Sequence, residues 1–295
     1  MTYDHWTKEI GDQEEAKGRE RPLKDAVKKT LNKNKFYCFP VRKKARLTKA
    51  KAAKRLAFAK RWVKKPDSFF KRQVLGLDEG HVRCYTGREG QEKAALGKKK
   101  HTICKKISKM RMHPVRVRGK TTGAHKQNLK SVPVMATVGN GKIRTWDYIK
   151  GSFTAEHWEA YVDNQISTDY ENMKKETHKE IFVLRDGHPS THNHEIGLEA
   201  EKRHKMKIIA QSTDTPEANP LDNSVWGAVE KEDLAYLQEQ YRLHGPTWYE
   251  TPAQRLERVR QIALNLPKDQ VDACMIHTKH NLQKIIDAGG WYIEG

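Results

Sequence analysis

The stretch IFVLRDGHP, residues 181–189, is an apolar, strand-like run that ends in a carboxylate, Asp186. A second acid, Asp222, follows in NPLDNSVWGAV, residues 219–229, with 35 residues between the two acids. A third, Asp78, lies in VLGLDEGHV, residues 74–82. Strand-like runs alternate with helical patterns along the chain, which predicts an α/β fold around a mixed sheet. Three carboxylates at strand ends and a helix start suit a site for two divalent metal ions about 3.5 to 4 Å apart, as in-line phosphodiester chemistry requires.

The segment around Asp222 favours a helix that begins at Pro220. Asn219 is a good N-cap, proline suits the first helical position, and Asp222 then falls where the helix dipole favours a carboxylate. Taken alone, each of the three acids has an innocent explanation as a turn, strand-end or dipole residue. Their joint placement at the ends of elements that a sheet would bring together favours a catalytic role.

A basic helical segment precedes this part of the chain. Residues 47–65 carry apolar side chains at helical spacing, with Thr48 as a candidate cap and Pro66 as the stop. We therefore divide the chain into a basic, largely helical segment, 1–66, and a catalytic-type domain, 67–295. Residues 1–35 are mixed in charge and weakly apolar, so we expect little independent structure there.

Further elements follow from local signals. Asn-Gly at 140–141 predicts a hairpin between strands Val134–Val138 and Lys142–Ile149. Thr154 is a candidate cap for a helix that extends to Ile166. Two more helices are expected within residues 251–290, the last ending at its Gly-Gly pair.

The net charge of +20 is concentrated in the first part of the chain. Residues 1–130 hold 38 Lys and Arg against 12 Asp and Glu, whereas residues 131–295 hold 19 against 25. Cationic side chains that neutralise phosphates release counterions, so we expect DNA binding that weakens steeply with salt. The alternatives are a solvated basic tail and a nuclear localisation signal at 42–46. The candidate nucleic-acid contacts are Lys43, Lys44, Arg46, Lys54, Arg55, Arg61, Lys98, Lys99, Lys100, Lys105, Lys106, Arg116 and Arg118.

Several protein classes find no support in the sequence. The four cysteines form no CxxC pair, which argues against a zinc ribbon and a disulfide framework and fits a reducing compartment. No run of 18 apolar residues and no signal peptide is present, so we expect no membrane partner. Phosphate-loop, dinucleotide-binding and nucleophile-elbow motifs are absent as well.

Three histidines follow Asp186 closely: His188, His192 and His194. A zinc site is one interpretation, but zinc usually takes four ligands, or three and a water, and no cysteine completes this set. We favour polar loop histidines beside the catalytic acid, with His188 and His192 as auxiliary residues that contact phosphate.

The motifs together resemble those of the mariner-like, DDE/D-type cut-and-paste transposases. TPEANPLDNSVWGAV (215–229) resembles that family's SPDLNPIENLWGxL segment, LRDGHPSTHN (184–193) its second acidic motif, and LGLDEGHV (75–82) its first. The basic helix at 42–62, the hairpin and helix at 132–158 and the C-terminal helix at 271–290 are also similar to family segments. The resemblance covers roughly residues 28–295.

The resemblance implies a ribonuclease H-like domain in which helices flank a mixed five-stranded sheet. Asp78, Asp186 and Asp222 would be both the catalytic and the metal-binding residues, and the cofactor would be two Mg²⁺ or Mn²⁺ ions. The implied function is a metal-dependent nuclease and strand transferase that cuts and joins phosphodiester bonds at transposon ends. DNA would be the partner, as transposon ends and target, and the protein a homodimer when bound to it. The location would be nuclear in a eukaryote, and otherwise cytoplasmic with DNA.

Some positions depart from the family pattern. Gly187 and His188 replace the usual Asn-Ala after the second acid, and His192 falls one place later than the family histidine. The chain is also expected to begin inside the second N-terminal helix-turn-helix unit, so it would lack most recognition of end sequences. Two alternatives therefore stay open: a non-catalytic DNA-binding remnant of a transposase, and a structure-specific nuclease acting on RNA or hybrid duplexes.

Overall fold

The structure is a computed structural model that divides into two compact units. It describes residues 12–15, 20, 24–33, 36–40, 47–85, 102–106, 129–151, 153–187, 192–212 and 215–293. The smaller unit comprises residues 1–46, 97–121 and 294–295, and the larger unit comprises residues 47–96 and 122–293.

In the smaller unit, helix α2 (Lys24–Lys33) contacts strand β1 (Phe36–Pro40), which pairs antiparallel with β3 (Thr102–Lys106). The expectation of little structure in residues 1–35 is therefore wrong for α2. The helix has Asp25 in its first turn, which suits the helix dipole, and it buries Val27 to 4% exposure. Val27 and Leu31 are the only large apolar residues among the ten of this helix, which is too weak a pattern to recognise in sequence.

The larger unit contains the predicted mixed five-stranded sheet. Its strand order is β5-β4-β2-β6-β7, so the central strand β2 has β4 on one side and β6 on the other. The pairs β5–β4 and β4–β2 are antiparallel, whereas the pairs β2–β6 and β6–β7 are parallel. The strands are β2 (Val74–Tyr85), β4 (Leu129–Gly139), β5 (Lys142–Tyr148), β6 (Phe182–Arg185) and β7 (Lys207–Ala210).

The hairpin between β4 and β5 is confirmed. Asn140 and Gly141 both have positive φ, 53° and 76°, as the favoured two-residue hairpin turns require. β4 begins five residues before the predicted strand and ends one residue after it, whereas β5 begins at Lys142 as predicted and ends one residue earlier, at Tyr148.

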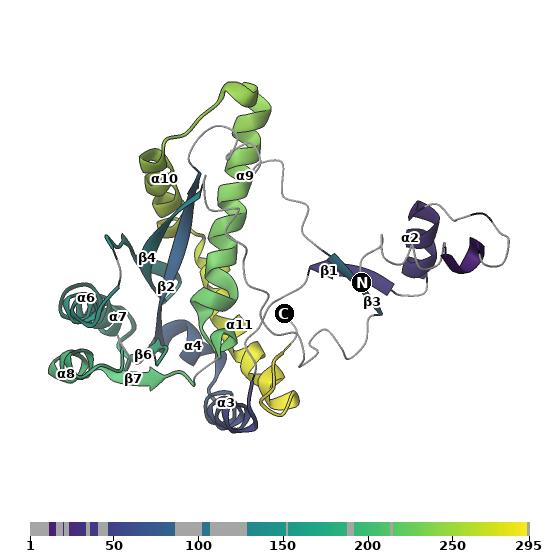
Figure 1. The fold of residues 1–295 in the computed structure, drawn as a ribbon. Helices are drawn as coiled ribbons and strands as arrows, with labels where there is room; N and C mark the ends of the chain where they lie inside the picture. The colour runs from purple at the N-terminus through teal and green to yellow at the C-terminus, as the bar shows by residue number, and fades with distance from the viewer. Residues whose placement is uncertain are drawn as a thin grey trace. The chain divides into compact units, whose positions relative to one another are not determined.

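One face of the sheet is covered by α6 (Ala155–Tyr161), the π-helical turn η2 (Val162–Ile166), α7 (Ser167–Thr177) and α8 (Glu195–Arg203). Figure 1 shows α6, α7 and α8 together on this side. Leu77, Trp158 and Met173 belong to the core between the sheet and these helices, each at most 1% exposed. Thr154 caps α6 as predicted, because its side chain accepts a hydrogen bond from the His157 N–H.

The other face carries the longest helices, and Figure 1 shows α9 and α11 along the strands of the sheet. The elements are α3 (Lys49–Trp62), α4 (Asp67–Gln73), η3 (Pro216–Ala218), η4 (Leu221–Val225), α9 (Trp226–His244), η5 (Gly245–Thr247), α10 (Pro252–Leu264) and α11 (Lys268–Asp287). Val74, Trp146 and Val271 are core residues on this side. In the described part of the chain, no helix has the length and apolar character needed to cross a membrane.

Helix α3 packs in the larger unit, which begins at Leu47. The predicted cap is present, since Thr48 Oγ1 accepts from the Lys51 N–H at 3.3 Å, and the helix ends before Pro66. The division expected after Pro66 thus falls inside this unit, because α3 is anchored to α11 and the chain end that follows it. Arg55, on α3, is fully buried and donates to the Gly290 carbonyl at 2.9 Å.

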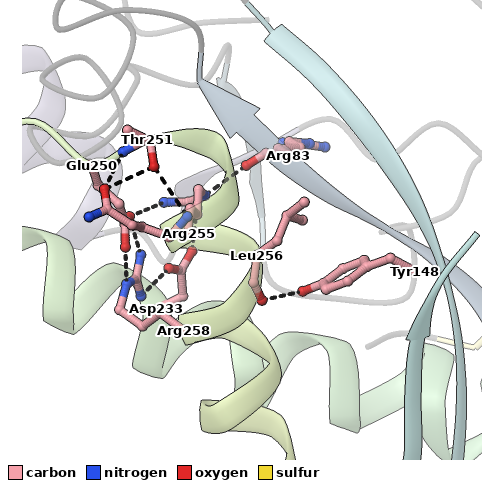
Figure 2. A network of polar contacts seen from close by, with 9 residues as sticks. Arg83, Tyr148, Asp233, Glu250, Thr251, Arg255, Leu256 and Arg258 are labelled. Carbon is pink, nitrogen blue, oxygen red and sulfur yellow. Dashed lines mark hydrogen bonds and ion pairs between the residues drawn. The ribbon is translucent and has the colours of Figure 1, made fainter.

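A network of ion pairs joins α9, α10 and β2 (Figure 2). Arg258 donates to Glu250 at 2.6 Å and to Asp233 at 2.7 Å. Arg255 pairs with the same Asp233 and also donates through Nε to the carbonyl of Arg83 in β2, at 2.8 Å. Charge-assisted hydrogen bonds of this kind fix geometry, so the network holds α9 and α10 in place beside the central strand.

Candidate functional site

Asp78 lies within β2, the central strand, and its side chain is 9% exposed. One carboxyl oxygen, Oδ2, accepts a hydrogen bond from Trp226 Nε1, in the first residue of α9, at 3.3 Å. Burial raises the pKa of Asp78 well above its ordinary value, and the charges of Asp222 and Glu79 raise it further. This is the setting of a carboxyl that either holds a proton or faces a cation.

Asp222 lies on η4, the turn that leads into α9, and reaches solvent. Partial burial raises its pKa, and so does the charge of Asp186. The hydrogen bond that joins Asp222 to Asp78 lowers the pKa of Asp222 and raises that of Asp78. Two carboxyls that interact in this way do not both ionise unless a cation lies between them.

Asp186 directly follows β6, beside β2 in the sheet. Its side chain is 43% exposed, so it reaches solvent, as Asp222 does. Its charge raises the pKa of Asp222. The pKa of Asp78 responds to Asp222, and the pKa of Asp222 responds to Asp186, so the charges of the three predicted acids act on one another. Among the described residues, however, the group of possible ligands within 4.8 Å of one another is Glu79, Asp186 and His192, which contains only one of the three.

Arg185, next to Asp186, fixes the end of β6. It is 2% exposed and forms a two-pronged ion pair with Glu201 of α8, at 2.6 and 2.9 Å. Its NH1 also donates to the Asp186 carbonyl at 2.8 Å and to Asn193 Oδ1 at 3.1 Å. Asn193 in turn donates to the Gly187 carbonyl at 3.0 Å. The Asp186 carbonyl is therefore held by a charge-assisted hydrogen bond from Arg185, and the Gly187 carbonyl by a neutral one from Asn193.

His192 joins Asp186 to Glu79. Its imidazole is 1% exposed, with Nδ1 hydrogen-bonded to Asp186 and Nε2 2.9 Å from Glu79 Oε1. The ring of Trp158 packs against it at 4.3 Å between centroids. Burial lowers the pKa of His192, but the two carboxylates outweigh this effect and raise it to about 9. The ring is therefore a charged double donor at neutral pH.

The cluster Glu79, Asp186 and His192 has possible metal-ligand atoms within 4.8 Å of one another. Both ring nitrogens of His192 already face a carboxylate, however, and a protonated nitrogen does not bind a metal. We therefore interpret His192 as an ion-paired link between two acids, hydrogen-bonded to Asp186 through Nδ1 and 2.9 Å from Glu79 through Nε2. Of the other predicted histidines, His194 is exposed at the start of α8, and His188 lies outside the described residues.

The predicted nucleic-acid contacts have mixed outcomes. Lys54 and Arg61 are exposed on α3, as a phosphate contact requires. Arg55 is a correction: it is fully buried and pairs with Glu217 at 3.0 Å, because it lies on the face of α3 that packs against the core. Lys105 and Lys106 lie on β3. The remaining candidates are outside the described residues: Lys43, Lys44, Arg46, Lys98, Lys99, Lys100, Arg116 and Arg118.

Sequence reasoning missed two residues of the site. Glu79 neighbours Asp78 in sequence but points to the opposite face of β2, toward His192, as alternation in a strand dictates. Trp226 packs edge-on against Trp146, with 5.1 Å between ring centroids, and its N–H donates to Asp78. A buried tryptophan N–H usually has a hydrogen-bond acceptor, so an acid close to Trp226 in the predicted fold was the signal that could have indicated this contact.

The sheet order, the helices on both faces and the acids beside β2 and β6 define a ribonuclease H-like α/β domain, as predicted. The fold is similar to that of the catalytic domain of Mos1 mariner transposase: TM-score 0.59, 10% identity, 85% of this chain and 99% of that chain covered. A pre-cleavage Mos1 transpososome gives a TM-score of 0.62 and 12% identity, with 100% and 76% covered. The Mos1 paired end complex with Mg gives a TM-score of 0.61 and 12% identity, with 100% of this chain and 76% of that chain covered. No family model and no curated protein matches the chain.

Proposed function

We propose that this chain is a transposase-type DNA endonuclease and strand transferase whose metal-binding residues are Asp78, Asp186 and Asp222. The observation that supports the proposal is the register of β2 and β6, which puts Asp78 and Asp186 each two residues beyond the paired residues Gly76 and Leu184, with Asp222 electrostatically coupled to both acids. The similar Mos1 structures include complexes with Mg and with Mn, a paired end complex and a strand transfer complex. These descriptions support DNA as the partner and a divalent ion as the cofactor.

The donor set fits a hard divalent cation. Asp78 and Asp222 are in hydrogen-bonding contact, and Asp186 is close enough to raise the pKa of Asp222. Close carboxyls repel once ionised, and a cation removes that penalty. Asp222 and Asp186 present carboxylate oxygens to solvent, and Mg²⁺ and Mn²⁺ prefer such oxygens, whereas both ring nitrogens of His192 contact acids.

The protein groups have distinct tasks in this proposal. When bound, two Mg²⁺ or Mn²⁺ ions would supply activation of a water or a 3′-hydroxyl and stabilisation of the leaving oxygen. Asp222 and Asp186 offer solvent-facing carboxylate oxygens. Asp78 offers a buried carboxylate oxygen once it is ionised. Arg185 and His192 hold Asp186 in place. Because phosphoryl chemistry depends chiefly on positioning and charge, rigid carboxylates are what such a site needs.

Exposed cations support the assignment of DNA as the substrate. Lys54 and Arg61 lie on the solvent side of α3, in the same unit as the acids. The acid-free basic blocks at 28–65 and 93–146 add further positive charge. A homodimer on DNA is part of the proposal, since joining two ends requires both to be held together.

A non-catalytic DNA-binding protein of the same fold is the second candidate. One observation favours it: the charged ring of His192 contacts Asp186 directly and would compete with a cation for that carboxylate. This candidate keeps salt-sensitive DNA binding and has no cleavage.

A nicking assay separates the two candidates. Purified protein is incubated with supercoiled plasmid in Mg²⁺ or Mn²⁺, and we expect nicked product that EDTA abolishes. Asp186→Asn should reduce nicking to background while DNA affinity, followed by fluorescence anisotropy, is retained. Glu239→Gln is the matched control, because Glu239 is an exposed acid of α9 that pairs only locally with Arg242. DNA binding without nicking by the unaltered protein selects the second candidate, and stronger cleavage of RNA or hybrid duplexes would point to a nuclease of different substrate class.

A further inference from the structure

Asn219 connects the backbone beside Asp78 to the backbone beside Asp222. Its side chain is 1% exposed. Nδ2 donates to the carbonyl of Leu77 at 3.0 Å, and Oδ1 accepts from the N–H of Leu221 at 3.0 Å. Leu77 is the residue before Asp78, and Leu221 is the residue before Asp222.

The Leu77 carbonyl lies just beyond the end of the parallel pairing with β6. The parallel pairing of β2 with β6 stops at Gly76, one residue earlier, so the ladder supplies no partner from β6 beyond that point. Leu77 is fully buried, which excludes water as a ready substitute. A side-chain amide is the neutral group that donates and accepts in one plane, so asparagine satisfies both backbone groups at once.

Two close contacts flank this amide. A Cβ added at Gly76 would lie 2.7 Å from Pro220 Cγ, so the proline ring packs directly on the strand. A Cβ added at Gly80 would lie 2.7 Å from Trp226 Cζ2, so the indole does the same on the other side of Asp78. These contacts press the turn against β2 but are apolar, and apolar contacts do not fix position along the strand.

We propose that Asn219 is a positioning residue that sets the separation between the Asp78 and Asp222 carboxyls. Its two hydrogen bonds are directional and reach the peptide units that carry both acids, so they define where the turn sits along β2. Asn219 touches no reacting atom and acts through the two acids. As a role in catalysis, this inference rests on the proposed function; as a statement about geometry, it does not.

The test uses Asn219→Ala and Asn219→Asp in the full chain. The alanine variant loses both hydrogen bonds. The aspartate variant keeps the acceptor for the Leu221 N–H but turns an oxygen toward the Leu77 carbonyl. Asn281→Ala is the matched control, because Asn281 is also buried, at 4% exposure, and also donates to a backbone carbonyl, that of Glu217, at 3.1 Å.

Crystal structures of the unaltered protein and the variants give the first readout, the distance between the Asp78 and Asp222 carboxyl carbons. We expect it to change in both Asn219 variants and to stay the same in Asn281→Ala. Mn²⁺ affinity by titration calorimetry gives the second readout, and we expect it to fall about 10- to 100-fold in the Asn219 variants alone, as for other residues that orient metal ligands. If only one Asn219 variant folds, it decides the question by the same two readouts.

An unchanged carboxyl separation in the Asn219 variants would overturn the inference, whatever the activity. A changed separation with Mn²⁺ affinity equal to that of the unaltered protein would also overturn it, because the separation would then not matter for the site. Absence of Mn²⁺ binding by the unaltered protein counts against the proposed function instead, and the carboxyl separation alone then decides whether Asn219 positions the acids.

Discussion

Asp78 and Asp186 stand at equivalent places in two parallel neighbouring strands, each two residues beyond the paired residues Gly76 and Leu184. Both acids therefore lie where the parallel pairing of β2 with β6 ends, although β2 itself continues to Tyr85, and ligands of α/β folds bind at the carboxyl ends of parallel strands. The third acid, Asp222, reaches the same edge by another route, through a turn docked on β2. The geometry of such a site depends on the register between β2 and β6 and on the position of the turn against β2.

The indole N–H of Trp226 is predicted to orient Asp78. Trp226→Phe keeps the aromatic packing on Gly80 but removes the donor to Asp78 Oδ2. We expect about 10-fold weaker Mn²⁺ binding by calorimetry, the lower end of the range for residues that orient ligands. Trp248→Phe is the control, because Trp248 packs against Tyr241 away from the acids. Equal Mn²⁺ affinity of Trp226→Phe and the unaltered protein would remove Trp226 from the site.

We predict that Gly80 is required for the close packing of α9 against β2. In Gly80→Ala, the new methyl would meet three atoms of the Trp226 ring at 2.7 to 2.9 Å, and such overpacking costs about 1–3 kcal/mol. Gly227→Ala is a contrasting variant one residue after Trp226: nothing lies within 4 Å, and alanine in a helix should add about 0.5–1 kcal/mol. Urea unfolding measures both. A neutral Gly80→Ala would show that Trp226 can move without cost.

The exposed cations of α3 are predicted to contact DNA phosphates. Lys54→Ala with Arg61→Ala should weaken binding for all sequences alike, and each lost contact should reduce the slope of log K against log salt by about 0.9. Fluorescence anisotropy at several salt concentrations measures the slope. Arg55→Ala should instead lower the Tm, because it leaves the carboxylate of Glu217 and the Gly290 carbonyl without their donor. An unchanged slope in the double variant would place the DNA elsewhere.

Stability is predicted to fall in acid through Glu176. Burial raises the pKa of this carboxyl, but hydrogen bonds from Arg144, Lys142 and Asn140 outweigh it and lower the pKa from 4.5 to about 2. A depressed carboxyl pKa stabilises the folded state above the unfolded value, so this contribution is present above pH 4.5 and is lost as pH falls toward 2. We expect Glu176→Gln to have a lower free energy of unfolding than the unaltered protein at neutral pH, and this free energy should change less between pH 4.5 and pH 2. Urea unfolding at several pH values measures both. A parallel shift at every pH would contradict the linkage.

The sequence was sufficient for elements whose signals are local. Thr48 and Pro66 bounded α3, the Asn140-Gly141 pair defined the hairpin, and Asn219 began the turn that carries Asp222. Each depends on a backbone or capping preference that tertiary contacts do not need to supply. The α/β class followed because strand and helix patterns alternate along the chain.

Other features depend on which distant groups meet. The cation pattern of α3 does not reveal that Arg55 faces the core while Lys54 faces solvent, since both suit a basic helix. The link from Glu79 through His192 to Asp186 joins three segments, and only the assembled sheet brings them together. The second hydrogen bond of Asn219, to Leu77, spans 142 residues of sequence and has no local signal.

The central claim is that Asp78, Asp186 and Asp222 hold divalent ions together, and one measurement tests it most directly. Crystals are grown with Mn²⁺, and anomalous scattering locates the ions. The account predicts anomalous peaks among these three carboxylates, with no peak beside His192 on its Glu79 side. Peaks confined to the Glu79 side of His192, or no peak near the three acids at saturating Mn²⁺, would contradict it.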